Sequence, residues 1–276
     1  MGKKINIVLI SFMLLVAAAI MIFYGIRSEL PKTAVDDKAV MAKEEGLLFD
    51  RAKKAAESGD LNTARDVYQR IVEKFPSSNK IAKAQEALDE INIKILFSGM
   101  STKDSVVYEV QKGDTITRIA KKFGTTPELI MKSNDLKDPT IQVGRKLKVN
   151  TAKFSIVVDK SQNILTLKSG QDIVKTYRVS TGKNSCTPVG TFKITNKIVD
   201  PLWYKGPGMV IPAGDHKNVL GSRWLGISKP SYGIHGTVQP DSIGESVTEG
   251  CVRMKNSDVE ELYVIVPEGT EVVITD

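Results

Sequence analysis

Apolar residues recur at helical spacing in the first third of the chain. After a polar stretch over residues 28–38, this periodicity predicts three helices, at Ala39–Ser58, Asn62–Phe75 and Lys80–Phe97. Gly59 and Asp60 follow the first helix, and Pro76 follows the second. Because glycine and proline interrupt helices, these residues set the expected ends.

The pattern changes over the next 45 or so residues to strand, helix, helix, strand. Alternation predicts strands at Val106–Val110 and Lys146–Val149, and helical spacing predicts short helices at Ile116–Phe123 and Pro127–Ser133. We therefore expect a small βααβ domain.

From Phe154 onward, short alternating apolar segments are separated by Gly, Pro, Asn and Asp. This pattern is typical of an all-β sandwich or barrel, with helix expected only near Ser257–Ile265. The predicted strands fall in residues 155–159, 163–170, 172–182, 190–199 and 270–276. The whole chain is thus predicted to be a multidomain α+β protein.

The N-terminal segment Ile5–Ile26 carries no charge. Its 22 residues would span about 33 Å as a helix, enough to cross a bilayer core. A cleaved signal peptide is the alternative, because Lys3 and Lys4 precede the run and residues 17–19 are alanines. The run continues well beyond those alanines, so we expect an uncleaved anchor at residues 1–27.

With 276 residues, the chain is long enough for more than one domain. Its net charge is +7, from 39 basic and 32 acidic residues, which favours anionic envelope polymers or lipid headgroups as partners. Nucleic acid is not expected, because no nucleic-acid motif is present. With two cysteines and two histidines, neither a metal site nor a cofactor is expected.

One cysteine and one histidine stand in a motif-like segment, YGIHGTVQPDSIGESVTEGCVRM, over residues 232–254. A cysteine needs a base or a cationic neighbour to become a thiolate. His235 precedes Cys251 by 16 residues, a separation that suits two loops converging on a cleft. We expect Cys251 to be a nucleophile with His235 as its base.

This segment resembles the catalytic domain of the L,D-transpeptidases, with support from residues 179–194 and 220–227. The resemblance covers residues 153–276 and implies site residues of two kinds. The implied catalytic residues are Cys251, His235, Gly236, Gly250 and Arg253. The candidate substrate-binding residues are Tyr232, Thr248, Glu249, Arg223 and Trp224. For Trp224, a place in the aromatic core is the alternative.

The resemblance implies attack by Cys251 on a stem tetrapeptide of peptidoglycan, giving a thioacyl-enzyme that an amine acceptor resolves in cell-wall cross-linking. A carboxypeptidase, an enzyme that attaches a protein to the wall, and a catalytically impaired wall-binding scaffold are the alternatives. Together with the anchor, this places the protein in the cytoplasmic (inner) membrane as a single-pass protein, with its C-terminal modules in the periplasm or cell-wall space.

Glu249 departs from the family pattern, which has histidine before Gly-Cys. A carboxylate near a thiol disfavours the thiolate and would repel a developing oxyanion. Alternatively, Glu249 holds His235 as imidazolium or binds a substrate amine. The sequence leaves these readings open.

Residues 105–150 resemble a LysM domain, which implies binding to glycans that contain N-acetylglucosamine. The matching positions are Gly113, Asp114, Thr115, Ile119, Ala120, Phe123, Gly124, Leu129, Asn134, Gly144 and Leu147. Among them, Gly113, Asp114, Thr115 and Asn134 are the implied glycan-binding residues. Turn, capping and core roles explain many of the same residues.

Residues 28–98 form the predicted helical segment, and Ala52–Pro76 resembles one tetratricopeptide repeat. A single repeat does not bury a continuous core, so a helical spacer is weighed against a platform for a protein partner through residues 39–97. His216 is expected on a surface loop, and Cys186 is expected to be a spare thiol or to bridge to Cys251.

Overall fold

The computed structural model describes residues 33–206 and 208–276, and the chain divides into two compact units, residues 1–84 and 85–276. In the first unit, α2 (Thr33–Glu57) and α3 (Leu61–Lys74) precede the start of α4 (Ile81–Phe97). The carboxylate of Asp60 caps α3 by accepting a hydrogen bond from the Thr63 amide at 3.1 Å.

The second unit begins with the rest of α4 and continues into a βααβ domain made of β1 (Ser105–Glu109), α5 (Ile116–Phe123), α6 (Pro127–Ser133) and β2 (Lys146–Asn150). Threonine hydroxyls cap both short helices, Thr115 by accepting from Arg118 N at 3.2 Å and Thr126 from Leu129 N at 2.9 Å. The small core consists of Val110, Ile116, Ile119, Ala120, Ile130, Leu147 and Val149.

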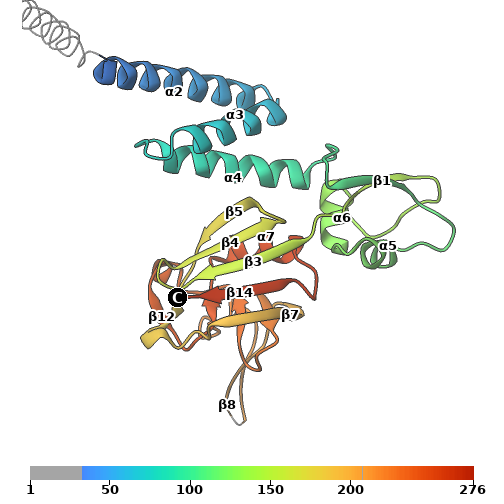
Figure 1. The fold of residues 1–276 in the computed structure, drawn as a ribbon. Coiled ribbons are helices and arrows are strands. Elements are labelled where there is room, and N and C mark those ends of the chain that lie inside the picture. The colour runs from blue at the N-terminus through green and yellow to red at the C-terminus, as the bar shows by residue number, and fades with distance from the viewer. Residues whose placement is uncertain (1–32, 207) are drawn as a thin grey trace, which may run out of the picture. The chain divides into compact units, whose positions relative to one another are not determined.

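The remaining chain forms an eight-stranded sheet in the order β13-β11-β10-β7-β14-β3-β4-β5 (Figure 1). Its strands are β3 (Phe154–Asp159), β4 (Ile164–Ser169), β5 (Asp172–Arg178), β7 (Gly190–Val199), β10 (Arg223–Ile227), β11 (Gly233–His235), β13 (Val252–Arg253) and β14 (Glu271–Thr275). Two pairs, β14 with β3 and β11 with β13, are parallel, and the other pairs are antiparallel.

Alternate residues of this sheet build the main core of the second unit, as expected for strands with one buried face. Helix α7 (Asn256–Ile265) buries Val259, Leu262 and Ile265 in the same core. Ile93 and Leu96 of α4 and Leu129 of α6 join it. The βααβ domain and the sheet are therefore packed within one unit.

Smaller pairs surround the sheet. Strand β6 (Thr181–Gly182) pairs with β12 (Ser246–Thr248), and β8 (Trp203–Gly206) forms a hairpin with β9 (Met209–Ile211). Two short 3-10 turns occupy Lys183–Ser185 and Pro240–Ser242.

Strands β11 and β13 bring two distant motifs side by side. Their parallel register sets Ile234 opposite Val252 and His235 opposite Arg253. Ser180 then pairs with Arg253 on the other side, through Ser180 N to Arg253 O at 2.8 Å and Arg253 N to Ser180 O at 2.9 Å. The His235 segment, the Cys251 segment and the loop that begins at Ser180 therefore meet at one edge of the sheet.

These observations confirm the mainly-β domain with a βααβ domain and helices N-terminal to it. The tetratricopeptide resemblance of residues 52–76 is not supported. The short strands β8 to β13, most of them two to five residues long, were not predicted, since so few residues give no clear alternation.

The predicted membrane anchor and single-pass localisation are corrected. Among the described residues, no helix is both long enough and apolar enough to cross a membrane. The apolar run Ile5–Ile26 lies outside the described residues. The inner-membrane localisation is therefore not retained.

Candidate active site

Cys251 follows a tight turn that begins at Thr248. The Thr248 hydroxyl donates to Cys251 O at 2.6 Å and accepts from Gly250 N at 3.2 Å. Gly250 has φ +118°, and a Cβ there would lie 2.7 Å from Cε1 of Tyr232. Because an L side chain fits neither the backbone angle nor the space, the turn requires glycine.

The Cys251 thiol is partly exposed and donates a hydrogen bond to Ser231 O at 3.8 Å. Burial raises the pKa of this thiol, and this effect outweighs a backbone hydrogen bond from Gly233 and the charge of Arg253, which lower it. The thiol is therefore protonated near neutral pH.

His235 is 3% exposed, and its Nδ1 lies 2.7 Å from Gly236 O. Since a carbonyl only accepts, Nδ1 carries the proton and Nε2 is left as the basic nitrogen. Burial lowers the pKa of His235 to about 4, although the Gly236 bond opposes this, and Arg253 lowers it further. The indole of Trp224 stacks on the imidazole with ring centroids 6.0 Å apart.

The backbone around His235 is fixed by Asn256, a residue that the sequence analysis did not single out. Asn256 Oδ1 accepts from Ser222 N at 3.2 Å and from Thr237 N at 2.9 Å. A Cβ on Gly236 would lie 2.2 Å from that oxygen, so Gly236 gives Asn256 its room. A polar residue at the start of α7 was the available signal, but it gave no indication of these partners.

Arg253 is a buried cation, 8% exposed, beside His235 in the strand register. Its Nη1 donates to Ser242 Oγ at 2.9 Å and Gln239 Oε1 at 3.4 Å, while Nε has no hydrogen-bond partner. In the described part of the chain no carboxylate pairs with it. A buried guanidinium with a free donor suits an anionic group of a ligand.

Glu249 points toward Lys183 rather than toward a histidine. The carboxylate lies 2.7 Å from Lys183 Nζ, and its side chain is 86% exposed. The ion pair raises the pKa of Lys183. Glu249 therefore does not hold His235 as imidazolium in this structure, because burial keeps His235 neutral.

The turn that carries Cys186 packs against the Thr248–Cys251 turn. Cys186 Sγ donates to Thr248 O at 3.8 Å, and Gly182 N donates to Thr187 Oγ1 at 2.7 Å. Both cysteines are free thiols, so the alternative of a bridge between them is not realised here.

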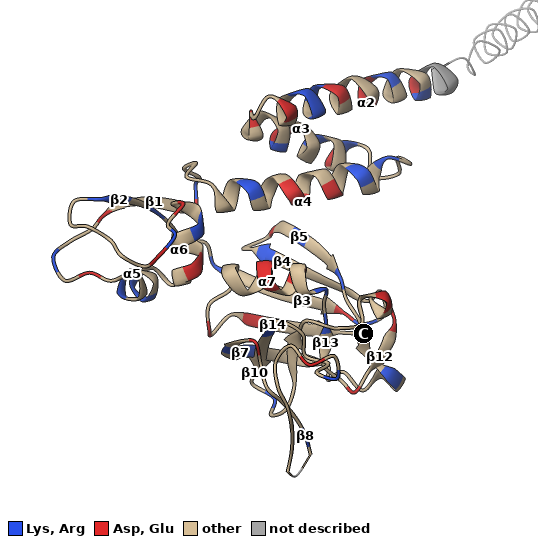
Figure 2. Ribbon diagram, turned by 180° about the vertical axis from the view of Figure 1, so that it is seen from behind, with Lys and Arg blue, Asp and Glu red and all other residues tan. Residues whose placement is uncertain are grey.

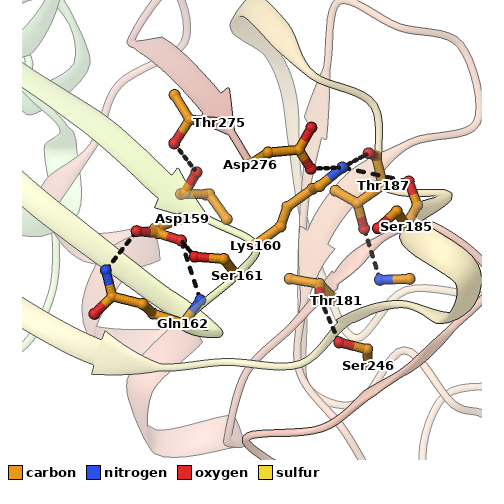
Figure 3. A network of polar contacts seen from close by, with 12 residues as sticks. Asp159, Lys160, Ser161, Gln162, Thr181, Ser185, Thr187, Ser246, Thr275 and Asp276 are labelled. Carbon is orange, nitrogen blue, oxygen red and sulfur yellow. Dashed lines mark hydrogen bonds and ion pairs between the residues drawn. The ribbon is translucent and has the colours of Figure 1, made fainter.

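Lys160 holds this turn in place, as Figure 3 shows. Its buried ammonium lies 2.7 Å from Asp276 Oδ1 and donates to Ser185 O at 3.3 Å and Thr187 O at 3.1 Å. A buried ammonium is stable only when such partners replace water. Lys160 was missed in the sequence because its partners are remote backbone carbonyls.

Not all of the expected substrate residues gather at the thiol. Arg223 donates to Ser222 O at 2.7 Å and lies over the Tyr263 ring at 5.5 Å, whereas Trp224, the next residue, faces His235. Successive residues of a strand point to opposite faces, which explains the difference. His216 is exposed and pairs with Asp215 at 3.3 Å.

The expected glycan-binding residues of the βααβ domain have hydrogen bonds within the domain. Asp114 Oδ2 accepts from Tyr108 Oη at 2.7 Å and from Gln111 N at 2.8 Å. These bonds lower the pKa of Asp114. The Asp114 carboxylate thus shapes the loop that Gly113 and Thr115 share.

Asn134 forms more hydrogen bonds within the domain than Asp114 does. Its Nδ2 donates to Ile130 O at 2.7 Å and Lys148 O at 2.8 Å, and its Oδ1 accepts from Lys148 N at 2.7 Å. The side chain therefore ties the end of α6 to β2, which is a structural role.

Comparison with known proteins identifies both domains. Residues 153–274 match the family model of the L,D-transpeptidase catalytic domain, and residues 108–150 match the LysM domain. The chain is 36% identical over 178 residues to the L,D-transpeptidase YkuD of Bacillus licheniformis, covering 62% of this chain and 99% of that protein. YkuD of Bacillus subtilis is 35% identical over 176 residues, covering 61% and 98%.

A solved L,D-transpeptidase from Mycobacterium smegmatis aligns with a TM-score of 0.38 and 18% identity, covering 49% of this chain and 65% of that one. The family assignment rests on the Bacillus sequences instead.

The two matched domains and the Bacillus relatives define an acyltransferase enzyme with a domain for binding peptidoglycan. The chain belongs to the L,D-transpeptidase family. Its function is accordingly in peptidoglycan cross-linking.

The Lys160 contact predicts a measurable effect on the neighbouring turn. Lys160→Met keeps the apolar stem but leaves the carbonyls of Ser185 and Thr187 without their donor, so we expect the free energy of unfolding to fall by about 1–3 kcal/mol. Urea titration measures this loss. Faster alkylation of Cys186 by iodoacetamide, mapped by peptide mass spectrometry, would show that the turn is released.

Lys193→Met serves as the control, because Lys193 is an exposed lysine of the same sheet. Unchanged stability and unchanged Cys186 alkylation in Lys160→Met would contradict the positioning role.

Proposed function

We propose that Cys251 is the nucleophile of this L,D-transpeptidase and that neutral His235 is its base. The observation that carries the proposal is the fixed tautomer of His235. Its Nδ1–H donates to Gly236 O at 2.7 Å, so Nε2 is free to take a proton. His235 lies on β11, which pairs with β13, the strand that follows Cys251. The raised pKa of Cys251 and lowered pKa of His235 support a neutral pair in the free enzyme.

The first step breaks one amide bond and forms one thioester. Cys251 Sγ attacks the carbonyl carbon between the L-centre of the diamino acid and the terminal D-residue of a stem tetrapeptide, while His235 takes the thiol proton. That proton then passes to the leaving amine, and the D-residue departs. We assign the backbone amide of Cys251 to the developing oxyanion, because the amide of Gly250 already donates to Thr248 Oγ1 at 3.2 Å.

The second step reverses these roles. An amine from a second stem attacks the thioester carbon, His235 takes the amine proton, and the thiol of Cys251 is restored with that proton. The product is a new amide cross-link.

Arg253 supplies the positive charge of the site. Its free Nε and its lack of a carboxylate partner within the described residues suit the carboxylate of the terminal D-residue or of a neighbouring stem. We assign Arg253 to binding rather than to proton transfer, because a guanidinium does not give up its proton at neutral pH.

The LysM domain holds the glycan that carries the stems. The loop over Gly113–Thr115 is exposed and offers backbone groups, whereas Asn134 is occupied within the domain. We therefore propose that this loop binds N-acetylglucosamine units and that Asn134 supports the domain from inside.

The proposal predicts a covalent intermediate on Cys251. Full-length protein incubated with disaccharide-tetrapeptide should lose the terminal D-residue from the substrate, form a dimer, and show a thioacyl adduct at Cys251 by peptide mass spectrometry. Cys251→Ala should abolish all three products, and His235→Gln should slow them by about 10²–10⁴-fold, the usual contribution of a general base.

Cys186→Ala is the matched control and should keep the adduct on Cys251. Loss of the D-residue without a dimer would identify a carboxypeptidase instead. An unchanged substrate would identify a wall-binding scaffold and overturn the proposal.

The position of Glu249 gives a separate prediction. Because its carboxylate pairs with Lys183 in solvent, Glu249→Gln should leave the pH dependence of Cys251 alkylation unchanged and alter kcat/KM by less than about threefold, as for exposed charges screened by water. Lys183→Gln is the partner control. A gain in rate above tenfold in Glu249→Gln would show that the carboxylate suppresses the thiol.

A further inference from the structure

A polar hollow of about 500 Å³ lies where α4 and α6 end, away from the cysteine site. It is lined by Phe97, Ser98, Gly99, Lys132, Ser133, Asn134, Asp135, Arg145 and Lys146. Apart from Asn134, none of these residues has a role in the function proposed above.

The charge of the lining is positive. Lys132, Arg145 and Lys146 are exposed, and across residues 33–206 and 208–276 none of them forms an ion pair with a carboxylate. The single carboxylate of the lining, Asp135, already lies 3.6 Å from Lys137. The lining therefore holds three cations against one carboxylate.

A fourth cation lies next to the hollow. Lys148 Nζ donates to Ile95 O at 3.0 Å, Leu96 O at 3.4 Å and Ser98 O at 2.7 Å, so its partners are neutral carbonyls at the end of α4. Burial lowers the pKa of Lys148 to about 8, which still leaves it mostly protonated at pH 7. This buried charge adds to the positive potential at Ser98.

Hydrogen bonds within the protein hold the residues that line the hollow. Lys148 joins β2 to the end of α4, and Asn134 joins β2 to the end of α6. The Lys132 ammonium lies over the Phe97 ring at 5.0 Å, and Phe97 also packs against the main core. A preformed site loses less binding free energy to the ordering of side chains.

The surrounding domain has the same sign of charge. Residues 105–150 contain 9 basic and 5 acidic side chains, a net charge of +4 (9 minus 5), and Figure 2 shows blue segments recurring along this part of the ribbon. Residues 151–276, with 14 basic and 13 acidic side chains, carry only +1. The positive charge is therefore a local property of the domain that holds the hollow.

We propose that this hollow binds an anionic saccharide, in which the carboxylate or phosphate groups contact Arg145, Lys146 and Lys132. The guanidinium of Arg145 suits either anion because it offers paired donors. This binding is separate from the Gly113–Thr115 loop and does not depend on chemistry at Cys251.

Calorimetric titration of the full chain at 150 mM salt tests the proposal with three probes. These are hyaluronan tetrasaccharide, which carries carboxylates, mannopentaose phosphate, which carries a phosphate monoester, and chitotetraose, which is neutral. At least one anionic probe should bind, and the Arg145→Gln/Lys146→Gln variant should weaken that binding at least tenfold. Binding of chitotetraose should be unchanged in the variant.

Lys121→Gln/Lys193→Gln is the matched control, since it removes the same charge from exposed positions outside the lining. Binding of the carboxylate probe alone or the phosphate probe alone supports the proposal and identifies the anion. Equal weakening in the control would reduce the effect to general electrostatics and overturn it. Binding of chitotetraose alone, or of no probe, would also overturn it.

Discussion

The hydrogen bond between His235 Nδ1 and Gly236 O is the interaction on which the rest of the site depends. Because Gly236 has no side chain, Asn256 Oδ1 has room to accept hydrogen bonds from the amides of Thr237 and Ser222 and so to hold the backbone that follows His235. Burial then keeps the imidazole neutral, with a pKa of about 4. A single tautomer, held by the backbone, replaces the carboxylate that orients histidine in many hydrolases.

In the proposed mechanism, a neutral imidazole and a protonated thiol change how the nucleophile is activated. With the pKa of Cys251 raised, the proposed proton transfer accompanies the attack rather than preceding it. In the same proposal the charge of Arg253, which lowers the pKa of Cys251, also favours the negative charge that develops on the substrate. Glu249, which replaces the usual histidine, points to Lys183 and is exposed, so its charge is paired with Lys183 and screened by water. The unusual residue is thereby compatible with the family's chemistry.

Local features were predictable from the sequence, and long-range pairings were not. Helices α5 and α6 have the predicted bounds. Each begins after a threonine, Thr115 or Thr126, whose hydroxyl accepts a hydrogen bond from the amide three residues further along the chain. The family resemblance drew attention to Cys251 and His235, although it gave no contact between them. The parallel pairing of β11 with β13, and the buried contacts of Lys160 and Lys148, join segments that no local pattern relates. The hydrogen bonds of Asn134 to Lys148 are another long-range contact that the sequence did not indicate.

The protonation state of His235 is the most direct test of this account, and nitrogen NMR of the imidazole rings measures it. The chain has only two histidines, so a His216→Gln variant assigns the spectrum. The account predicts a neutral ring protonated at Nδ1, with a pKa of about 4. A proton on Nε2, or a pKa near the ordinary value of about 6.5, would contradict it.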